Sequence, residues 1–183
     1  ESFRFLYHEI ERPLVPVLVD LELEGYPVDI GYQESLAKQY QQRLQEVEKT
    51  IYTLAGRQFN LNSAKQVAEA LANSLGHPVE STRQEVLERL RGKHKIVEAL
   101  LKYRETAKRL STYLNLQAHP RTGRVHPEYH QARVVTGRLA SSIHTIPNED
   151  EIRRVYVAEP GYVLVTADYK AQEVRLVAAC AGE

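Results

Sequence analysis

The chain has 183 residues, of which 43% are hydrophobic and 26% are charged, and its net charge at neutral pH is zero. This composition excludes wholesale disorder, and the length suffices for one domain or two small ones. No apolar run approaches the roughly 20 residues of a membrane-spanning helix, and the N-terminus lacks a signal-peptide pattern. The single cysteine, Cys180, excludes a disulfide framework and a cysteine-based zinc site, which fits an intracellular protein. Because methionine is absent, even at position 1, we expect a processed product or a piece of a larger protein.

The zero net charge conceals an uneven distribution along the chain. Residues 1–80 carry 7 basic and 12 acidic side chains, residues 81–138 carry 13 and 5, and residues 139–183 carry 4 and 7. The net charges of the three blocks are therefore −5, +8 and −3. Local field matters more than total charge for binding a polyanion, so the middle block is compatible with a nucleic-acid partner. A solvated basic helix without a ligand is the alternative.

The first half of the chain predicts helices. An apolar stripe with an early proline over residues 13–23 predicts a short buried helix, and residues 28–30 predict a brief extended link. A long helix is expected from Glu34 to the capping glycine Gly56, because apolar residues recur at spacings of three and four. These residues are Leu36, Tyr40, Leu44, Val47, Ile51 and Leu54.

Three further helices are expected before residue 118. Residues 63–66 have the spacing of a capping box and open a helix that runs to about Leu75. Residues 82–85 repeat this spacing for a shorter helix that ends near Gly92. A second long helix is expected over residues 94–117. Its apolar face consists of Ile96, Val97, Leu100, Leu101, Ala107, Leu110 and Leu114.

The rest of the chain predicts turns, strands and one helix. Residues 121–124 predict a turn and residues 147–151 a polar loop. The apolar segments 155–158 and 162–167 predict two strands that a short turn joins into a hairpin. A last helix is expected over about residues 171–181. The organisation is thus a helical part followed by an α+β part.

Asp168 is the residue whose position points most directly to chemistry. It follows an apolar predicted strand and precedes a helix, which would display its carboxylate on a rigid base, a common way to hold Mg²⁺. On spacing alone, a helix cap or a surface aspartate is the simpler interpretation. Glu173 and Arg175 on the next helix are compatible with an exposed charged pair. Residues 136–142, around Arg138, lack the glycine spacing of a P-loop or a dinucleotide fingerprint, and a plain loop is the alternative.

Residues 168–183 read DYKAQEVRLVAACAGE, and they resemble the first catalytic motif of family A DNA polymerases, the bacterial DNA polymerase I type, which is typically DYSQIELR. Residues 59–66 resemble the family's FN(I/L)NSPKQL, and residues 102–113 resemble its thumb helix, which ends in KxxSTY. Three further segments match in the same order. They are residues 119–124 (HPxTGR in the family), 136–142 (TGRLSS) and 158–162 (the approach to the catalytic strand). The resemblance covers nearly the whole chain.

The resemblance implies an α+β fold, in which a mainly helical thumb is followed by a partial palm with a short antiparallel sheet. We expect a palm-proximal segment over residues 1–33, the thumb over 34–117 and the partial palm over 118–183. The implied activity is template-directed addition of deoxynucleotides to a primer 3′ end by two-metal phosphoryl transfer. The implied partners are primer–template DNA and, in the parent protein, a dNTP, with no membrane. The implied location is the cytoplasm or nucleoid.

The resemblance also assigns roles at the catalytic motif. Asp168 would be one of two carboxylates that bind the catalytic Mg²⁺ pair, together with the backbone carbonyl of Tyr169. Glu173 matches the acid that crowds the 2′ position of the sugar and excludes ribonucleotides, so Glu173 and Tyr169 are the expected nucleotide-binding residues. Only half of the two-metal site is encoded, because the later motif with the second carboxylate has no counterpart here.

Other matched positions are implied to bind DNA. Arg138 matches the arginine that reads the minor groove at the primer end. Lys108, Ser111 and Thr112 match thumb positions that grip the duplex backbone, and the basic block supplies the surrounding field. The expected DNA-binding residues are Lys108, Ser111, Thr112 and Arg138, with Arg104, Arg109 and Arg133 from the basic block.

Several departures mark a divergent member. Residues 170–172 are Lys, Ala and Gln in place of the usual Ser, Gln and Ile, and residues 143–147 are a shortened form of the usual PNLQNIP. The chain also lacks the fingers, so we expect it not to polymerise alone. The missing portion would be the rest of the chain or a separate subunit.

Two alternatives remain open. The first is a non-enzymatic duplex-DNA-binding module, either a split polymerase subunit or a decayed copy. The second is a helical protein-interaction domain without a nucleic-acid role, which predicts no salt-dependent binding to DNA.

Overall fold

The computed structural model describes residues 2–115 and 117–182. Residues 1, 116 and 183 belong to the predicted first segment, second long helix and catalytic motif, and they lie outside the described residues. Two helices, η1 and η2, are π-helical, and η3 is a 3₁₀ helix. The elements are α1 (Ser2–Phe5), η1 (Leu6–Glu11), α2 (Arg12–Glu24), β1 (Tyr26–Pro27), α3 (Ile30–Ala55), α4 (Ala64–Leu75), α5 (Gln84–Arg89), α6 (Lys95–Lys108), η2 (Arg109–Leu114), β2 (Arg124–Val125), η3 (Ser142–Thr145), α7 (Asp150–Arg153) and α8 (Gln172–Ala181).

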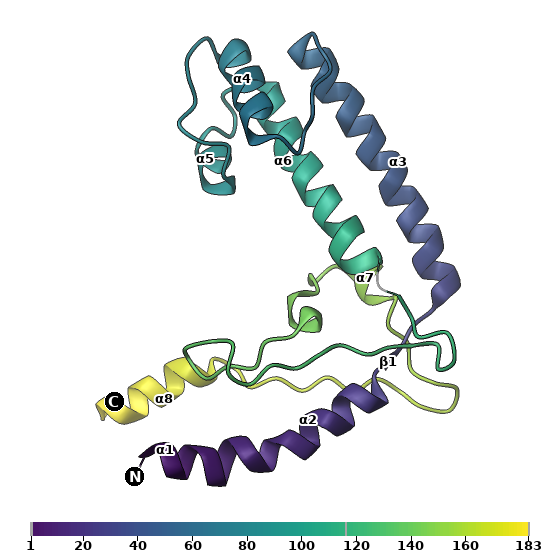
Figure 1. Cartoon of the computed structure of the whole chain (residues 1–183), viewed down its shortest axis with the longest axis vertical. Helices are drawn as coiled ribbons and strands as arrows, with labels where there is room; N and C mark the ends of the chain where they lie inside the picture. The colour runs from purple at the N-terminus through teal and green to yellow at the C-terminus, as the bar shows by residue number, and fades with distance from the viewer. Residues whose placement is uncertain (1, 116, 183) are drawn as a thin grey trace.

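Two long helices connect the two ends of the molecule (Figure 1). α3 and α6 lie side by side, and at their far end they pack with α4 and α5. At their near end they meet a second part that contains α2, β1, α7 and α8. We call residues 30–114 the upper part, and the described residues before and after them the lower part.

The first long helix begins earlier than its apolar spacing indicates. α3 starts at Ile30 rather than Glu34, because the carboxylate of Asp29 accepts a hydrogen bond from the Tyr32 amide at 2.9 Å and caps the helix. Gly56 ends the helix with φ of 68°, in the left-handed conformation that glycine adopts at little cost. The predicted C-terminal cap is therefore confirmed.

The two predicted capping boxes have different outcomes. Ser63 caps α4 by accepting from the Gln66 amide, but the Gln66 side chain bonds the Asn60 amide at 2.8 Å instead of returning to Ser63. At α5 the prediction is wrong, since the N-cap is Arg83 and it makes no side-chain cap. Thr82 is buried there, and the Ser81 hydroxyl accepts from the Arg83 amide.

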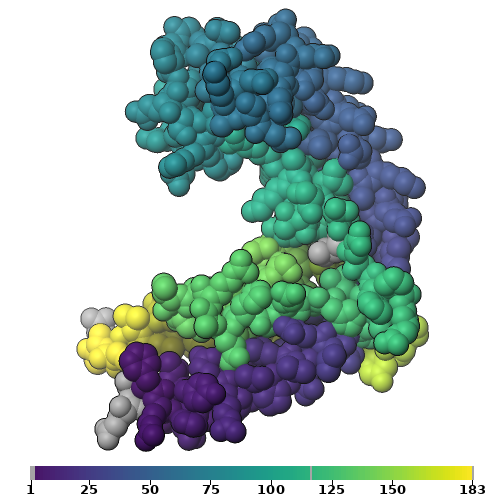
Figure 2. Space-filling model, viewed as in Figure 1, coloured from purple at the N-terminus to yellow at the C-terminus, as the bar shows by residue number. Residues whose placement is uncertain are grey.

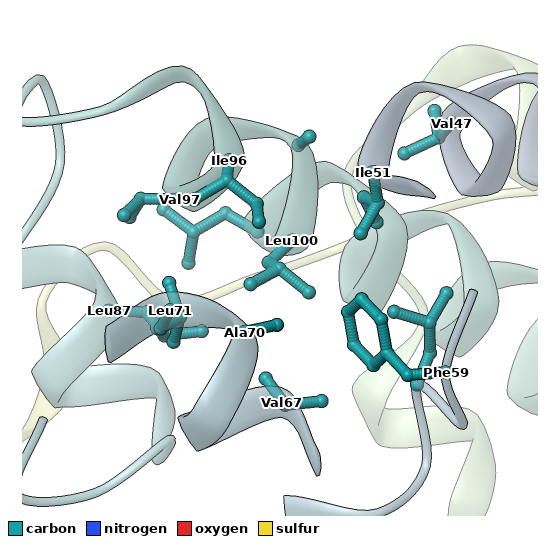
Figure 3. Close-up of a cluster of buried hydrophobic side chains, with 13 residues drawn as sticks. Val47, Ile51, Phe59, Val67, Ala70, Leu71, Leu87, Ile96, Val97 and Leu100 are labelled. Atoms are coloured by element: carbon teal, nitrogen blue, oxygen red, sulfur yellow. The ribbon is translucent and has the colours of Figure 1, made fainter. Parts of the chain in front are cut away.

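The upper part encloses the larger hydrophobic core. Helices α3, α4, α5 and α6 and the loop between α3 and α4 contribute its side chains, and Figure 3 shows how they converge between the helices. The residues are Val47, Ile51, Phe59, Leu61, Val67, Ala70, Leu71, Leu87, Ile96, Val97, Ala99, Leu100 and Leu101. The apolar stripes predicted for the two long helices account for about half of this set, so they correctly identified the faces that pack.

A second core lies where the upper and lower parts meet. It joins two residues of α3 and the last residue of η2 to side chains from the lower part. Its members are Val28, Leu36, Tyr40, Leu114, Val125 and Val155. The second long helix ends at Leu114, three residues before its predicted end, and its last six residues widen into the π-helical η2. The helix pair is therefore anchored in a core at each end.

The sheet of the lower part is small. β1 pairs antiparallel with β2, placing Tyr26 opposite Val125 and Pro27 opposite Arg124. Val28 continues β1 by bridging Tyr156 on the other side. Gly25 precedes β1 with φ of 61°, and a Cβ atom there would lie 2.7 Å from the Val125 carbonyl oxygen. A glycine is thus required where α2 turns into the sheet.

Two predictions for the lower part are corrected. Residues 13–23 do form a helix, but α2 is exposed along most of its length, and Leu18 is its one buried residue. The predicted hairpin does not form, although the turn does, with the Tyr162 amide donating to the Glu159 carbonyl at 2.9 Å. A strand needs a neighbouring backbone, and residues 162–167 pair with none in the described chain.

The remaining predictions for the lower part agree with the structure more closely. Residues 121–124 form the expected turn, and α8 covers the expected last helix. The end of the polar loop at 147–151 becomes the short helix α7. The α+β class is confirmed. Among the described helices, none is long and apolar enough to cross a membrane.

Candidate nucleic-acid interface

A broad hollow separates the upper part from the lower part in the space-filling view (Figure 2). On the side of α6 and η2 lies a cleft of about 540 Å³, walled by α5, by α6 and η2, and by the loop before α7. Most of the residues that line it are polar or charged, and four of them are Arg or Lys. The lining residues are Gln84, Glu88, Arg91, Leu101, Arg104, Glu105, Lys108, Arg109, Tyr113 and Pro147.

The predicted DNA-binding residues of the upper part divide into two groups. Lys108, Ser111 and Thr112 are exposed at the junction of α6 and η2, where they are accessible to a ligand. Arg104 is half-buried, donates to the carbonyl of Thr82, and has its pKa lowered by burial. Arg104 therefore already holds the segment before α5 against α6.

Arg109 also has partners within the protein. Its Nε donates to Glu149 Oε2 at 2.8 Å, and its Nη2 bonds the other oxygen of the same carboxylate. Nη2 also lies 2.8 Å from Glu105, one turn earlier on the helix. The hydrogen bond from Arg109 lowers the pKa of the Glu149 carboxyl, although partial burial opposes this effect. This two-pronged geometry is the strong form of a carboxylate–guanidinium contact.

The predicted DNA-binding residues of the lower part lie in one loop. The amides and carbonyls of His130 and Ala140 bond each other reciprocally at 2.9 and 3.0 Å, which closes the loop between them. Arg133 and Arg138 are both exposed in this loop. Arg133 also lines a second depression of about 640 Å³ beside the loop. Both guanidinium groups can therefore reach a ligand from solvent.

The catalytic-motif residues are brought together only in part. Glu173, in the first turn of α8, pairs with Arg138 at 2.5 Å, so two residues 35 positions apart form one contact. Asp168 ends the extended segment before α8 and is exposed, as is Tyr169. Among the residues with described positions, no three His, Cys, Asp or Glu side chains lie together so as to hold a metal ion. The donors present do not fit a complete Mg²⁺ site.

Sequence reasoning missed three charged residues that organise this region. Glu149 and Glu151 lie in what was expected to be a plain polar loop, but they bond side chains of the upper part. Arg124, inside the HPxTGR-like motif, pairs with Glu24 at 2.5 Å and also with Glu159. Its Nε donates to the Glu24 carbonyl at 2.6 Å, which fastens the end of α2 to β2. The match to the family motif pointed to Arg124 but not to this role.

Comparisons with known proteins agree with this geometry. The family model described as DNA polymerase family A matches residues 31–183, and the chain belongs to this family. It is 40% identical over 202 aligned residues to the thermostable DNA polymerase I of Thermus filiformis, covering all of this chain and 24% of that protein. It is 43% identical over 194 residues to DNA polymerase I of Caldicellulosiruptor bescii, covering 97% of this chain and 23% of that protein.

A solved structure has the same arrangement. The POL domain of Pol1 from M. smegmatis, in complex with DNA primer-template and dNTP, matches with a TM-score of 0.78 and 26% identity. The match covers 95% of this chain and 34% of that one. The chain thus spans about a quarter of the length of the curated relatives and about a third of this structural neighbour.

The ionisation of buried tyrosines tests the packing between the upper and lower parts, where Tyr40 belongs to the second core. Burial, and then the hydrogen bond to Glu151, raises the pKa of Tyr40 to about 12, and burial raises that of Tyr156 to about 12. A pKa that is higher in the folded chain contributes stability below pH 10 that is lost as the pH rises toward 12. Phenylalanine at position 40 cannot ionise. We therefore expect Tyr40→Phe to reduce the alkaline decrease in the free energy of unfolding by up to about 2–3 kcal/mol, at about 1.4 kcal/mol per pKa unit.

The measurement is the free energy of unfolding by urea as a function of pH. The control is Tyr162→Phe, which removes the same hydroxyl from an exposed tyrosine that belongs to neither hydrophobic core. Identical profiles for wild type and Tyr40→Phe between pH 9 and pH 12 would contradict the buried environment of Tyr40.

Proposed function

We propose that this chain is the thumb and the first part of the palm of a template-directed DNA polymerase, which adds deoxynucleotides to the 3′ end of a primer. The observation that carries the proposal is the cleft, where a basic helix junction faces a hollow bounded by the rest of the chain. Its size and its charged lining residues suit a sugar–phosphate backbone better than a small apolar ligand. Membership of DNA polymerase family A supports this function.

The division of the chain follows from the same proposal. Residues 34–117 are the thumb, since the larger core lies within this range and depends on α3 and α6. Residues 1–33 are the palm-proximal segment, and residues 118–183 are the partial palm that contains the catalytic motif. β1 pairs with β2, which supports placing the first and last segments in one structural unit.

Duplex DNA is the proposed ligand of the cleft. Lys108, Ser111 and Thr112 bind the phosphate backbone from the thumb, because they are exposed at the junction of α6 and η2. Arg133 and Arg138 bind from the palm loop, with Arg138 leaving Glu173 when DNA arrives. Both side chains of this last ion pair are about 70% exposed (69% and 73%), so the pair is weak and exchangeable. The structural neighbour, solved with DNA primer-template and dNTP, supports these partners.

The proposed catalytic roles belong to the polymerase as a whole. Asp168 supplies one carboxylate and Tyr169 a backbone carbonyl, while Glu173 limits the space at the 2′ position of the incoming nucleotide. The family generally uses Mg²⁺, which two carboxylates would hold. The described residues contain no such cluster, so we propose that Mg²⁺ binds only when further carboxylates are supplied and that this chain alone does not polymerise.

The proposed partner is the remaining fingers and palm portion, within one longer polypeptide or as a separate subunit. Residues 162–165 form an apolar stretch with exposed fractions of 62–84%, and α8 exposes Val174, Leu176 and Val177. Exposed apolar side chains in such number are typical of an interface. A separate subunit would make this chain a duplex-binding module, the second candidate function. We infer an intracellular site of action at the nucleoid.

Binding to duplex DNA by the chain tests the cleft. We expect affinity that is independent of sequence and falls steeply with salt, because binding releases counterions from phosphates. Lys108→Ala should weaken binding uniformly across sequences and lower the salt slope by about one unit. Lys49→Ala is the matched control, because Lys49 is also an exposed thumb lysine but does not line the cleft. Fluorescence anisotropy at several salt concentrations measures both quantities.

The outcomes separate a DNA-binding role from the protein-interaction alternative. Equal loss of affinity in Lys108→Ala and Lys49→Ala would place DNA elsewhere on the thumb. Affinity for duplex DNA that does not change with salt, or no binding of duplex DNA at low salt, would support the protein-interaction alternative.

The role of Asp168 is tested in a complete polymerase. Residues 31–183 would replace the matching segment of Thermus filiformis DNA polymerase I, and primer extension with Mg²⁺ would be measured. We expect Asp168→Ala to lower extension about 10²–10³-fold, the usual loss when a group that stabilises transition-state charge is removed, while duplex affinity is kept. Asp150→Asn is the control and should retain full extension. Extension by the Asp168→Ala chimera at the unsubstituted rate would refute the proposed role.

A further inference from the structure

Two carboxylates at the start of α7 connect the lower part to α3 and η2 of the upper part. The Glu149 carboxylate accepts a hydrogen bond from the guanidinium of Arg109, at the start of η2. Glu151 receives the hydroxyl of Tyr40 and, at 3.3 Å, the guanidinium of Arg43, both from α3. Two acidic residues, separated by one position in the sequence, therefore bind two different helices, and we call these five side chains the root clamp.

Backbone contacts and packing extend the root clamp. The Tyr32 hydroxyl donates to the Glu151 carbonyl at 3.0 Å, and the Arg154 guanidinium lies 5.4 Å from the centre of the Tyr32 ring. The Arg109 side chain is only 19% exposed, so its ion pair is shielded from solvent more than the other ion pairs of the cleft. The contact with Glu149 is therefore the strongest member of the clamp.

The α7 end of the clamp is firmly held by the lower part. Ile152 and Val155 are fully buried, and Val155 belongs to the second hydrophobic core. The Asp29 amide donates to the Val155 carbonyl at 2.9 Å, and the Val157 amide donates to the Pro27 carbonyl at 3.1 Å. α7 is thereby tied to the sheet, so its two acidic side chains offer fixed points of attachment.

The clamp lies at the inner end of the cleft. Arg109 lines the cleft from η2, and Pro147 lines it from the loop that leads to α7. The Arg153 guanidinium donates to the Pro147 carbonyl at 3.3 Å, which ties this loop back to α7. A change in the Arg109–Glu149 contact would thus alter the angle between the walls of the cleft.

We propose that Glu149 is a positioning residue, which fixes the orientation of the thumb over the palm by binding Arg109. Arg109 then affects DNA binding through the width of the cleft, and not mainly through phosphate contact. The interpretation of the cleft as a duplex-binding groove rests on the proposed function. The clamp itself does not, because its contacts lie within the protein.

The direction in which Glu149→Gln changes DNA affinity distinguishes a positioning role from a purely electrostatic effect. Glu149→Gln removes a negative charge near a surface that binds a polyanion, so electrostatics alone predicts tighter DNA binding. Loss of the clamp predicts weaker binding, because apparent affinity falls in proportion to the fraction of molecules with the thumb correctly oriented. Asp150→Asn removes the same charge one residue away, and the Asp150 side chain has no partner in the described structure. It should bind DNA as wild type does or more tightly.

A distance measurement without DNA tests the clamp directly. In a Cys180→Ser background, spin labels at Lys65→Cys on α4 and Arg121→Cys beside β2 report the separation of the upper and lower parts. Pulsed electron–electron double resonance should give one narrow distance distribution for the background chain and for Asp150→Asn. Glu149→Gln should broaden it, since losing a charged hydrogen bond of this kind shifts the ratio of clamped to released molecules about tenfold.

A charge exchange provides the rescue. The double variant Arg109→Glu with Glu149→Arg restores the opposite charges and should restore the narrow distribution, whereas each single reversal should broaden it. Circular dichroism establishes that every variant is folded. An unchanged distribution in Glu149→Gln, equal broadening in Asp150→Asn, or no rescue by the exchange would each overturn the proposal. If no variant binds duplex DNA, the proposed function fails, while the distance measurement still decides the clamp.

Discussion

The packing of α3 against α6 and η2 is the contact on which the other features depend. α3 places Val47 and Ile51 in the larger core and Leu36 and Tyr40 in the smaller one, so a single helix belongs to both. The α6–η2 helix does the same, through residues 96–101 at one end and Leu114 at the other. Dense apolar packing of this kind transmits position because it resists small displacements. The orientation of the cleft walls is thus set first by the hydrophobic cores and then adjusted by ion pairs.

Charge is distributed in the fold differently from its distribution in the sequence. The basic block at residues 81–138 has a net charge of +8, but several of its arginines are used within the protein. Arg91 pairs with Glu88 and Glu98, Arg109 with Glu149, and Arg124 with Glu24 and Glu159. Lys108 and Arg133 remain exposed, and the pair between Arg138 and Glu173 is itself exposed. We therefore expect binding of a polyanion at the hollow to depend on the basic side chains exposed there, such as Lys108.

Local sequence patterns were sufficient to predict most helices. They were insufficient to predict the contacts between helices and the pairing of strands. Helical periodicity and capping residues such as Ser63 and Gly56 act over a few positions, so the sequence alone identifies most helices and their packed faces. The exposure of α2 was not predictable, because an apolar stripe indicates a face that can pack and does not say what covers it. The absent hairpin has the same cause, since strand pairing depends on a partner that local sequence does not specify.

The candidate site follows the same division between local and distant contacts. The position of Asp168 after an apolar segment is a local property, and it was recognised together with the family motif. The Arg109–Glu149 pair spans 40 residues and the Tyr40–Glu151 pair spans 111, so no periodicity in the sequence reveals them. Sequence reasoning assigned Arg109 to DNA because it lies in a basic block, whereas the fold places a carboxylate against it. The root clamp was not predicted because its members are far apart in the sequence.

We propose that duplex DNA lies between the thumb and the palm loop. Hydrogen–deuterium exchange of the chain, with and without a primer–template duplex, tests this most directly, since it reports the backbone that DNA covers. We expect slower exchange in η2 and in the loop over residues 130–142, with exchange in α1 and α2 unchanged. Protection confined to α1 and α2, or no change in η2 and the loop at saturating DNA, would contradict it.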